Sequence, residues 1–322
     1  MKGKLSEIFY MARDFFKIIT GVDYFHQPEK LGNFFQDGCS YYIDFKGKVN
    51  WTGKFIDNVP VLYIPSMDKY VFFPTMILQY GLGNIDMYFA TKNISYLKNV
   101  TNVYNWIVKN IKEDYSFDNL SQEMDREFEY YSNNSAMTQG EALSFLIRVV
   151  KYNLVNGVSE DAAKLIKNIF ENMILPLEQG GTIIQKGDEI YFCEYCRRNE
   201  YIVLNGWIFA IFGLFDYQQF FKDSISKRYL EKTLKTLEKN IEKFIMNNNW
   251  SYYDNKGRIS SPIYQELHIH LMDALYRLTH METFKNVKER LKKGNTWLNR
   301  IKYTLLKIRD KLKDTWRYST MK

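Results

Sequence analysis

Apolar and polar residues alternate between residues 36 and 73, and glycines interrupt the alternation. This pattern is typical of short hairpins, and the first is expected at residues 40–51. Further strands are expected at 59–64 and 70–73. Residues 1–35 are predicted to hold one helix and a linker. The N-terminal part of the chain is therefore predicted to be a helix followed by a small β region.

Beyond Pro74 the apolar positions recur every three to four residues, which is the spacing of helices that bury one side. The helices predicted from this spacing lie at 76–88, 96–111, 142–154, 159–173, 203–215, 230–246 and 264–279. Ser159 is expected to cap the helix that follows it. Hairpins are expected between helices, at 182–192 and 250–259. Helix pairs joined by hairpins predict a mainly α fold, an (α/α) toroid in which the connecting loops line one end.

The chain is predicted to have three parts: residues 1–73, an (α/α) catalytic domain at 74–284, and a basic amphipathic helix at 285–322. The last part holds 13 Lys/Arg and 3 Asp/Glu, whereas the whole chain carries a net charge of +7. Its apolar residues recur at helical spacing: Trp297, Ile301, Leu305, Ile308, Leu312 and Trp316. Such a helix can lie on an anionic membrane or hold a polyanion. The alternative is a helix packed on the body with its charged side in water.

Composition narrows the functional classes. Tyr, Phe and Trp make up 17% of the residues, which fits either an aromatic core or a cleft in which sugar rings stack on aromatic faces. Three cysteines are too few for a disulfide scaffold. Cys193 and Cys196 have CxxC spacing, but no further ligands or redox context accompany them, so neither a metal nor another cofactor is expected. With no evident signal peptide or membrane-spanning run, the expected location is the cytoplasm, with membrane association left open.

Known catalytic motifs are largely missing. The Gly81–Leu82–Gly83 triplet does not follow a clear strand, and no phosphate-binding loop or nucleophile elbow is present. The sequence instead has two polar, aromatic blocks, at residues 194–206 and 252–270. They supply a carboxylate and several phenols, and this inventory suits the removal and return of a proton at carbon.

Six segments resemble the D-glucuronyl 5-epimerases, which invert carbon 5 of glucuronate in heparosan-type chains to give iduronate. They are Gln-Tyr-Gly-Leu at 79–82, Asn-Ser-Ala-Met-Thr-Gln-Gly at 134–140, the block from Glu-Tyr at 194–195 to Val-Leu-Asn-Gly at 203–206, Gly-Leu-Phe-Asp at 213–216, Tyr-Asp at 253–254, and 264–269. The resemblance is strongest from Pro74 to about Thr279 and keeps the order and spacing of the family.

The resemblance implies roles for four residues. Glu194 and Tyr264 correspond to an opposed acid/base pair, and Tyr195 and Tyr253 to phenols that support it. The candidates for substrate binding are Tyr80, Gln139, Arg148, Arg197, Asn205, Arg258 and His268. Because a tyrosine has an ordinary pKa of about 10, we expect one that acts as a base to need nearby cations or hydrogen-bond donors, with Arg197, Arg198, Lys256 and Arg258 as candidates.

Each candidate also has a structural interpretation. Glu194 can be a solvated loop charge, Tyr264 a core residue, and Tyr253 a surface aromatic with Tyr252 as the alternative register. The remaining candidates can cap helices, bridge loops, face solvent or lie buried and hydrogen-bonded; they include Gln139, Asn205, Arg148 and His268.

The sequence therefore predicts a cofactor-independent uronyl 5-epimerase that acts on an acidic polysaccharide or a lipid-linked glycan. The alternatives are a uronate polysaccharide lyase, which shares the proton abstraction, and a non-catalytic glycan-binding protein. No nucleic-acid partner is expected. Contact with a membrane through the basic C-terminal helix, and a homodimer, are left open.

Overall fold

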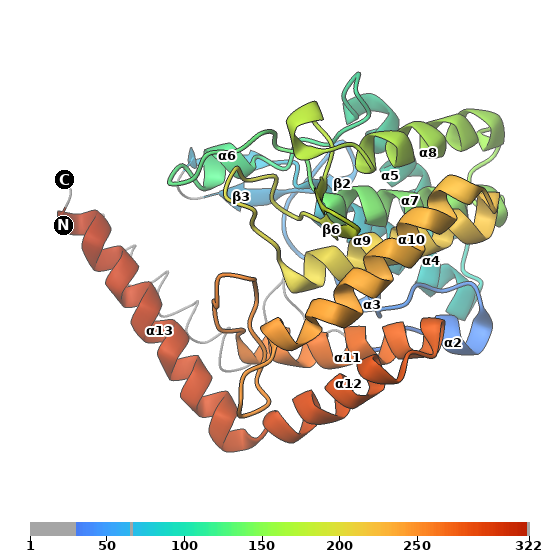
Figure 1. Cartoon of the computed structure of the whole chain (residues 1–322). Helices are drawn as coiled ribbons and strands as arrows, with labels where there is room; N and C mark the ends of the chain where they lie inside the picture. Colours follow the sequence, from blue (N-terminus) through green and yellow to red (C-terminus); the bar gives the residue numbers. More distant parts are fainter. Residues whose placement is uncertain (1–29, 65–66, 321–322) are drawn as a thin grey trace.

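The computed structural model describes residues 30–64 and 67–320, with side chains up to residue 309, and is mainly helical (Figure 1). Within the described residues the strands form separate antiparallel pairs. The predicted mainly α fold with small hairpins is therefore confirmed. The helix predicted within residues 1–35 lies, up to residue 29, outside the described residues.

Four helices form the inner layer: α4 (Pro74–Thr91), α7 (Ala136–Lys151), α9 (Leu204–Phe221) and α11 (Pro262–Thr279). Each packs against the next one in the chain, α4 on α7, α7 on α9 and α9 on α11. Helix α9 is apolar on almost every side, and its residues from Leu204 to Leu214 are all buried. A helix without a polar side belongs in the interior, which is where the fold places it.

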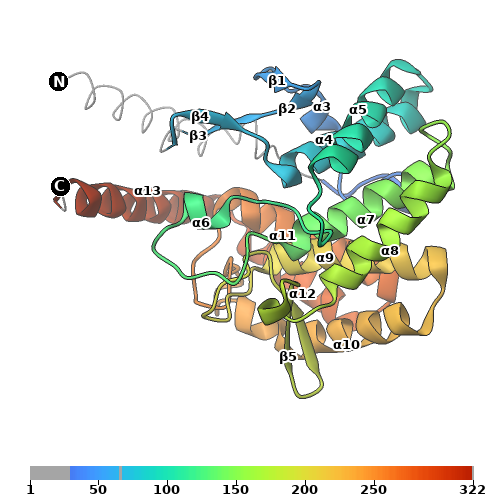
Figure 2. The same ribbon diagram turned by 90° about the horizontal axis from the view of Figure 1, so that it is seen from above.

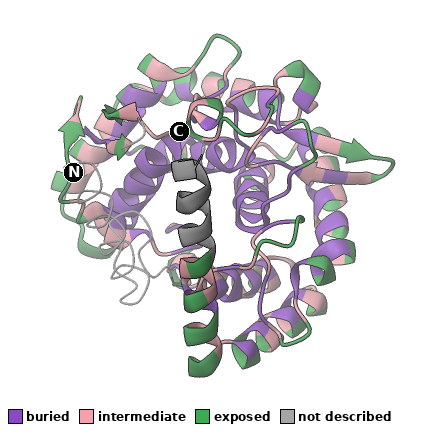
Figure 3. Ribbon diagram, turned by 90° about the vertical axis from the view of Figure 1, so that its left-hand side faces the viewer, coloured by how far each residue is buried: buried purple, intermediate pink, exposed green. Residues whose placement is uncertain are grey.

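Four amphipathic helices cover the inner ones: α5 (Ser95–Asn110), α8 (Ser159–Met173), α10 (Ser224–Asn240) and α12 (Glu282–Gly294). Each follows an inner helix and packs against it. Seen end-on, the helices surround a centre and turn their buried sides towards it (Figure 3). This alternation of inner and outer helices is the toroid-like arrangement that the sequence predicted.

The closest helix contact is between α7 and α9. A Cβ atom on Gly213 would lie 2.2 Å from the carbonyl oxygen of Gly140. Only glycines allow the two backbones to approach so closely. The backbones of the two inner helices are therefore in direct contact where Gly140 meets Gly213.

The predicted hairpin at residues 40–51 is wrong. Residues 34–37 form the short helix α2 (Phe34–Asp37), and residues 46–49 form α3 (Lys46–Val49) where a turn and a strand were expected. Tyr41, Tyr42 and Ile43 are consecutive and completely buried, so no side of this segment faces water. Tyr42 contacts the ring of Phe212 on α9, and among the described residues the backbone of the segment forms only an isolated antiparallel bridge, between Ile43 and Leu31.

The other predicted strands are largely confirmed. Strands β1 (Phe55–Ile56) and β2 (Val59–Pro60) form one pair, and β3 (Leu62–Ile64) and β4 (Lys69–Val71) form another. This small β region lies beside α4 and α5 (Figure 2).

Two connections between helices carry the candidate site. Strands β5 (Ile183–Lys186) and β6 (Glu189–Phe192) form the expected hairpin, with Ile183 opposite Phe192. The segment 250–259 turns back on itself through the pair Tyr252 and Ile259 but forms no regular strands. The remaining short elements are α6 (Ser121–Met124) and the 3-10 helices η2 (Leu177–Gln179) and η3 (Ile241–Phe244).

Side-chain caps fix several helix starts. Ser135, Asp223 and Ser261 accept hydrogen bonds from the backbone at the starts of α7, α10 and α11. The expected cap at Ser159 is wrong by one residue, because α8 begins at Ser159 and Val158 occupies the cap position without a side-chain hydrogen bond. The basic C-terminal region contains most of α12 and a second helix, α13 (Trp297–Thr320), after a break at residues 295–296.

Candidate active site

The predicted catalytic residues gather at the end of the ring where α9 and α11 begin. Glu194 and Tyr195 lie between β6 and α9, and Tyr264 lies in the first turn of α11. Tyr253 belongs to the segment 250–259. In Figure 1 the loops around this end lie on the left, opposite α2.

Glu194 lies against the first turn of α9, and a glycine makes this placement possible. A Cβ atom on Gly206 would come within 2.4 Å of a carboxylate oxygen of Glu194. Asn205 donates a long hydrogen bond, 3.4 Å, to the same oxygen. The carboxyl group is therefore closely packed, but this hydrogen bond to it is weak.

Burial raises the pKa of Glu194 from 4.5 to about 7. The hydroxyl of Tyr195 and the charge of Arg197 act in the opposite direction, but burial outweighs them. A carboxyl group with a pKa near 7 is present in both protonation states at neutral pH. Glu194 can therefore both accept and return a proton there.

Two phenols, Tyr195 and Tyr253, lie beside this carboxyl group, and two more lie next to them. Burial raises the pKa of Tyr195 and of Tyr253 well above 10, and Glu194 next to them raises both further. Tyr264 and Tyr201 lie close enough to contribute to the same effect. The rings of Tyr253 and Tyr264 meet edge to face, with centroids 4.8 Å apart. The structure thus brings together all four residues that the sequence proposed as catalytic, and their roles remain predictions.

The cation expected beside a tyrosine that acts as a base stays a prediction, and the two supporting tyrosines, Tyr195 and Tyr253, have raised pKa values. Arg197 lies 5.4 Å from the ring centroid of Tyr195 and 4.1 Å from that of Tyr201. Its guanidinium is buried and forms an ion pair with Asp125. The charge of Arg197 is thus already matched, and burial determines the direction of both tyrosine pKa shifts.

Arg258 is a more accessible cation at the border of the cluster. Its side chain is 52% exposed, and Nε lies 3.5 Å from a carboxylate oxygen of Asp254. Its guanidinium carbon is 6.0 Å from the ring centroid of Tyr201. The other two candidates, Arg198 and Lys256, are both exposed. Arg258 is therefore the cation best placed to meet an anionic group that enters the cluster.

Hydrogen bonds join the segment 250–259 to the start of α9. The backbone N–H of Leu204 donates to the carbonyl oxygen of Tyr253 at 3.0 Å. The hydroxyl of Tyr201 donates to the buried carboxylate of Asp254 at 2.7 Å. These bonds fix the position of Tyr253 relative to the helix start that carries Asn205 and Gly206.

His268 anchors this segment to α11. The hydroxyl of Ser251 donates to the amide oxygen of Gln265 at 2.8 Å, and His268 Nδ1 lies 2.8 Å from the same hydroxyl. Because that hydroxyl is already a donor, His268 must carry its proton on Nδ1. Burial lowers the pKa of His268 to about 3, so it is neutral at physiological pH. Nδ1 therefore has a structural role, and the substrate contact predicted for His268 stays a prediction.

Two other substrate-binding candidates have structural partners. The side-chain amide of Gln139 donates to Asn172 at 2.7 Å and to the backbone oxygen of Tyr115 at 3.1 Å, and is completely buried. Tyr80 is nearly buried in α4, and its ring meets Phe55 of β1 edge to face. Gln139 therefore holds loops together, and Tyr80 holds the small β region against α4.

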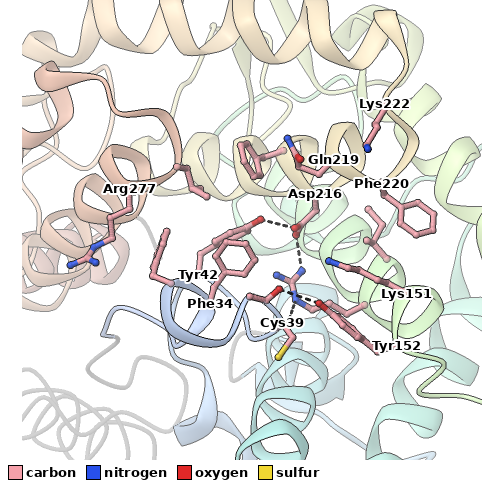
Figure 4. A pocket seen from close by; sticks show the side chains of 16 residues that line it. Phe34, Cys39, Tyr42, Lys151, Tyr152, Asp216, Gln219, Phe220, Lys222 and Arg277 are labelled. Atoms are coloured by element: carbon pink, nitrogen blue, oxygen red, sulfur yellow. Dashed lines mark hydrogen bonds and ion pairs between the residues drawn. The ribbon is translucent and has the colours of Figure 1, made fainter.

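The structure separates Arg148 from the cluster. Its guanidinium forms an ion pair with Asp216 at 2.7 Å and donates to the backbone oxygens of Cys39 and Ser40. Tyr42 donates to the other oxygen of Asp216 at 2.6 Å. Asp216 lies near the end of α9 that is far from Asn205, so Arg148 lies apart from Glu194, and the substrate contact predicted for it stays a prediction. Figure 4 shows this buried network.

A cavity of about 610 Å³ opens beside that network, at the end of the ring opposite Glu194. Its aromatic lining consists of Phe34, Phe35, Tyr42, Tyr152, Phe215 and Phe220 (Figure 4). Lys151 and Lys222 border it and are exposed. The cavity therefore belongs to the structural end of the fold, not to the tyrosine cluster.

Sequence reasoning missed Tyr201 and underused Asp254. Tyr201 lies between the Glu-Tyr pair and the Val-Leu-Asn-Gly motif, so its position within the matched block was the available signal. Its contact with Asp254, 53 residues later, was not readable from spacing.

The two cysteines with CxxC spacing are buried free thiols. Burial raises the pKa of Cys196 to about 12 and that of Cys193 well above 9, so both remain protonated. Among the described residues, no group of three or more His, Cys, Asp and Glu side chains is arranged to hold a metal ion. No helix in the same part of the chain combines the length and apolar character needed to cross a membrane.

Comparison with known proteins identifies a family model that covers this part of the chain. The family model described as D-glucuronyl C5-epimerase C-terminus matches residues 121–293, more than half of the chain. The match contains Glu194, Tyr195, Tyr253 and Tyr264. A search of the curated proteins gave no match. The chain belongs to the D-glucuronyl C5-epimerase C-terminal family and is an epimerase of that family.

Proposed function

We propose that the protein converts D-glucuronate to L-iduronate by inverting carbon 5, in a heparosan-like polysaccharide or a lipid-linked glycan. The observation that supports this most is the carboxyl group of Glu194, which ionises near neutral pH beside protonated phenols. Inversion at a carbon requires one group that removes a proton and another that delivers one to the opposite face. The cluster holds both kinds of group.

In the first step, the carboxylate of Glu194 removes the proton from carbon 5. The electron pair of the broken C–H bond moves onto the adjacent substrate carboxylate, which becomes an enediolate. Arg258 and the hydroxyls of Tyr195 and Tyr253 donate hydrogen bonds to this developing charge. The high pKa of both phenols keeps them protonated, as donors must be.

In the second step, the hydroxyl of Tyr264 delivers a proton to the opposite face of carbon 5. The electron pair of the enediolate forms the new C–H bond, and the configuration is inverted. Glu194 is left protonated and Tyr264 is left as a phenolate. Exchange of protons with water restores both groups, so the overall reaction requires no cofactor.

Asn205 is suited to orient the sugar. Its amide nitrogen is directed to Glu194, and its amide oxygen is buried without a hydrogen-bond partner among the described residues. Buried oxygens of this kind are normally satisfied. A hydroxyl group of the substrate would supply the missing donor.

The test is incubation with desulfated heparosan in deuterated water, followed by NMR and by ultraviolet absorbance of unsaturated uronates. We expect deuterium at carbon 5 and signals of iduronate. Glu194→Gln and Tyr264→Phe should lower the exchange rate at least a thousandfold, since each removes one of the two proton-transfer groups.

Glu189→Gln is the matched control. Glu189 begins β6, the strand that precedes Glu194, but pairs with Lys239, so its variant should keep the wild-type exchange rate. A rise in ultraviolet absorbance would identify a lyase instead, because elimination leaves a double bond. Binding of the polymer with neither exchange nor cleavage would identify a glycan-binding protein and contradict the proposal.

A further inference from the structure

Helix α13 is attached to the body along one side only. The ring of Tyr303 stacks on Trp250 with centroids 4.5 Å apart, and Tyr303 is 1% exposed. Arg300 forms an ion pair with Glu266 of α11 at 3.1 Å. Beyond these contacts the helix projects away from the ring (Figures 1 and 2).

The side of α13 that faces away from the body is apolar. Trp297 is 73% exposed, Leu298 71%, Ile301 40% and Leu305 58%. At about 100° per residue, these four side chains fall within an arc of roughly 100°, and Tyr303 lies on roughly the opposite side. We call these four residues the apolar stripe. The outer helices α5, α8, α10 and α12 bury their apolar sides, so the exposed stripe sets α13 apart from them.

Basic residues border the apolar stripe on both sides. At the same angular spacing, Lys302 and Arg309 follow one edge, and Arg300 and Lys307 follow the other. Over its whole length α13 contains seven Lys/Arg and two Asp. An exposed apolar side with basic borders is the pattern of helices that lie in the surface of a membrane.

The apolar stripe favours a lipid surface over a polysaccharide as the partner of α13. An anionic polymer would use the basic residues but would leave Leu298, Ile301 and Leu305 in water. In a lipid surface, these side chains enter the boundary of the acyl chains, Trp297 lies at the level of the headgroups, and the basic residues meet the phosphates. One surface thus satisfies both features.

We infer that α13 binds the surface of an anionic membrane through the apolar stripe and its basic borders. The helix is attached beside the start of α11, where Glu266 lies two residues after Tyr264. Membrane binding would therefore place the end of the ring that carries Glu194 near the lipid surface. The orientation of that end towards a membrane-borne glycan rests on the proposed function, whereas lipid binding does not.

The test is flotation of the full chain with vesicles of phosphatidylglycerol and phosphatidylcholine in equal parts, and with vesicles of phosphatidylcholine alone. We expect at least tenfold stronger binding to the anionic vesicles, and loss of most of it in 0.5 M salt. The triple variant Leu298→Gln/Ile301→Gln/Leu305→Gln should bind at least tenfold more weakly. Ile94→Gln/Val108→Gln, which changes exposed apolar residues elsewhere, should bind like the wild type.

Several outcomes would overturn the inference. They are absence of wild-type binding to anionic vesicles, equal binding to both kinds of vesicle, and unchanged binding of the triple variant. A wild-type dimer that the triple variant converts to a monomer, without lipid binding, would assign the apolar stripe to self-association. Because the substituted side chains are exposed, the triple variant should keep the wild-type melting temperature and exchange rate on a soluble oligosaccharide, which separates this test from that of the proposed function.

Discussion

A carboxylate, a phenol and an arginine lie together at each end of α9, but only at one end does the arginine pair with that carboxylate. Near the C-terminal end of α9, Asp216 accepts hydrogen bonds from Arg148 at 2.7 Å and from Tyr42 at 2.6 Å, so its buried charge is matched. At its start, Glu194 receives a hydrogen bond of 3.4 Å from Asn205, and the nearby arginine pairs with another carboxylate. A carboxylate, a phenol and an arginine thus form a structural network at one end and a titratable group at the other.

The two ends of α9 contain the same types of side chain, and they differ in the partner of each carboxylate. A satisfied buried ion pair stabilises one arrangement and leaves no group free to change its charge. A poorly solvated carboxyl group keeps a pKa near neutrality and can exchange protons. Four tests, in order of decreasing expected effect, examine this contrast.

The largest effect is expected at the structural end. Arg148→Met leaves Asp216 buried without its cation and should lower the free energy of unfolding by about 3–5 kcal/mol. The exchange rate per folded molecule should stay unchanged, because Arg148 lies far from Glu194. Urea unfolding and exchange in deuterated water measure the two quantities. Arg148→Met/Asp216→Leu should recover most of the stability, and a double variant as unstable as the single one would speak against the pairing.

Two glycines on α9 should separate activity from stability. Gly206→Ala places a methyl group where the carboxylate of Glu194 lies, so the exchange rate should fall about tenfold to a hundredfold. Gly213→Ala meets the backbone of Gly140 and should cost about 1–3 kcal/mol of stability at an unchanged rate per folded molecule. Equal kinetic losses in both variants would show that the placement of Glu194 is not what Gly206 protects.

The raised pKa of Glu194 makes both activity and stability depend on pH. The exchange rate should rise with pH through about 7, as the carboxylate forms. Because the folded-state pKa exceeds the unfolded value of about 4.5, the stability of the wild type falls as pH rises from 4.5 through 7. Glu194→Gln lacks this loss, so it should match the wild type at pH 4 and exceed it at pH 8 by on the order of 2 kcal/mol. Urea unfolding at both pH values measures this difference. The prediction would be contradicted if the free energy of unfolding of the variant differed from that of the wild type by the same amount at pH 4 and at pH 8.

The smallest effects are expected from a pair of tyrosines. Tyr42→Phe removes the hydrogen bond to Asp216 and should cost about 1.5 kcal/mol of stability, with the exchange rate retained. Tyr195→Phe should lower the exchange rate and leave stability nearly unchanged. Thermal unfolding and exchange rates of both variants check this. A loss of exchange rate in Tyr42→Phe and a loss of stability in Tyr195→Phe would contradict the assignment of a structural end and a titratable end to α9.

The sequence predicted the features that depend on local periodicity and matched motifs. The helices from Pro74 onward, the hairpin of β5 and β6, and the group Glu194, Tyr195, Tyr253 and Tyr264 are present in the structure. Periodicity identifies a helix wherever one of its sides is buried.

The errors arose where long-range packing decides. The segment 40–45 was predicted to pair with residues 49–51, but Tyr41 and Tyr42 are both completely buried and, within the described part of the chain, the segment forms only an isolated bridge with Leu31. Arg148 lies in the same helix as Gln139, yet its partner Asp216 is 68 residues away, which no spacing could reveal. Burial likewise raises the pKa of Tyr195 and Tyr253, and the charge of the nearby Arg197 is matched by Asp125, which lies 72 residues earlier in the chain.

The hydrogen bond from Leu204 to Tyr253 also has a consequence for synthesis of the chain. Glu194 emerges from the ribosome well before Tyr253 and Tyr264, the second of which follows 70 residues later. At about 5–20 residues per second, roughly 4 to 14 s separate the two events. For most of that interval the nascent chain carries Glu194 without Tyr264 and without Tyr253, whose carbonyl oxygen receives the first N–H of α9. Chain growth itself therefore delays the appearance of activity until α11 has been made.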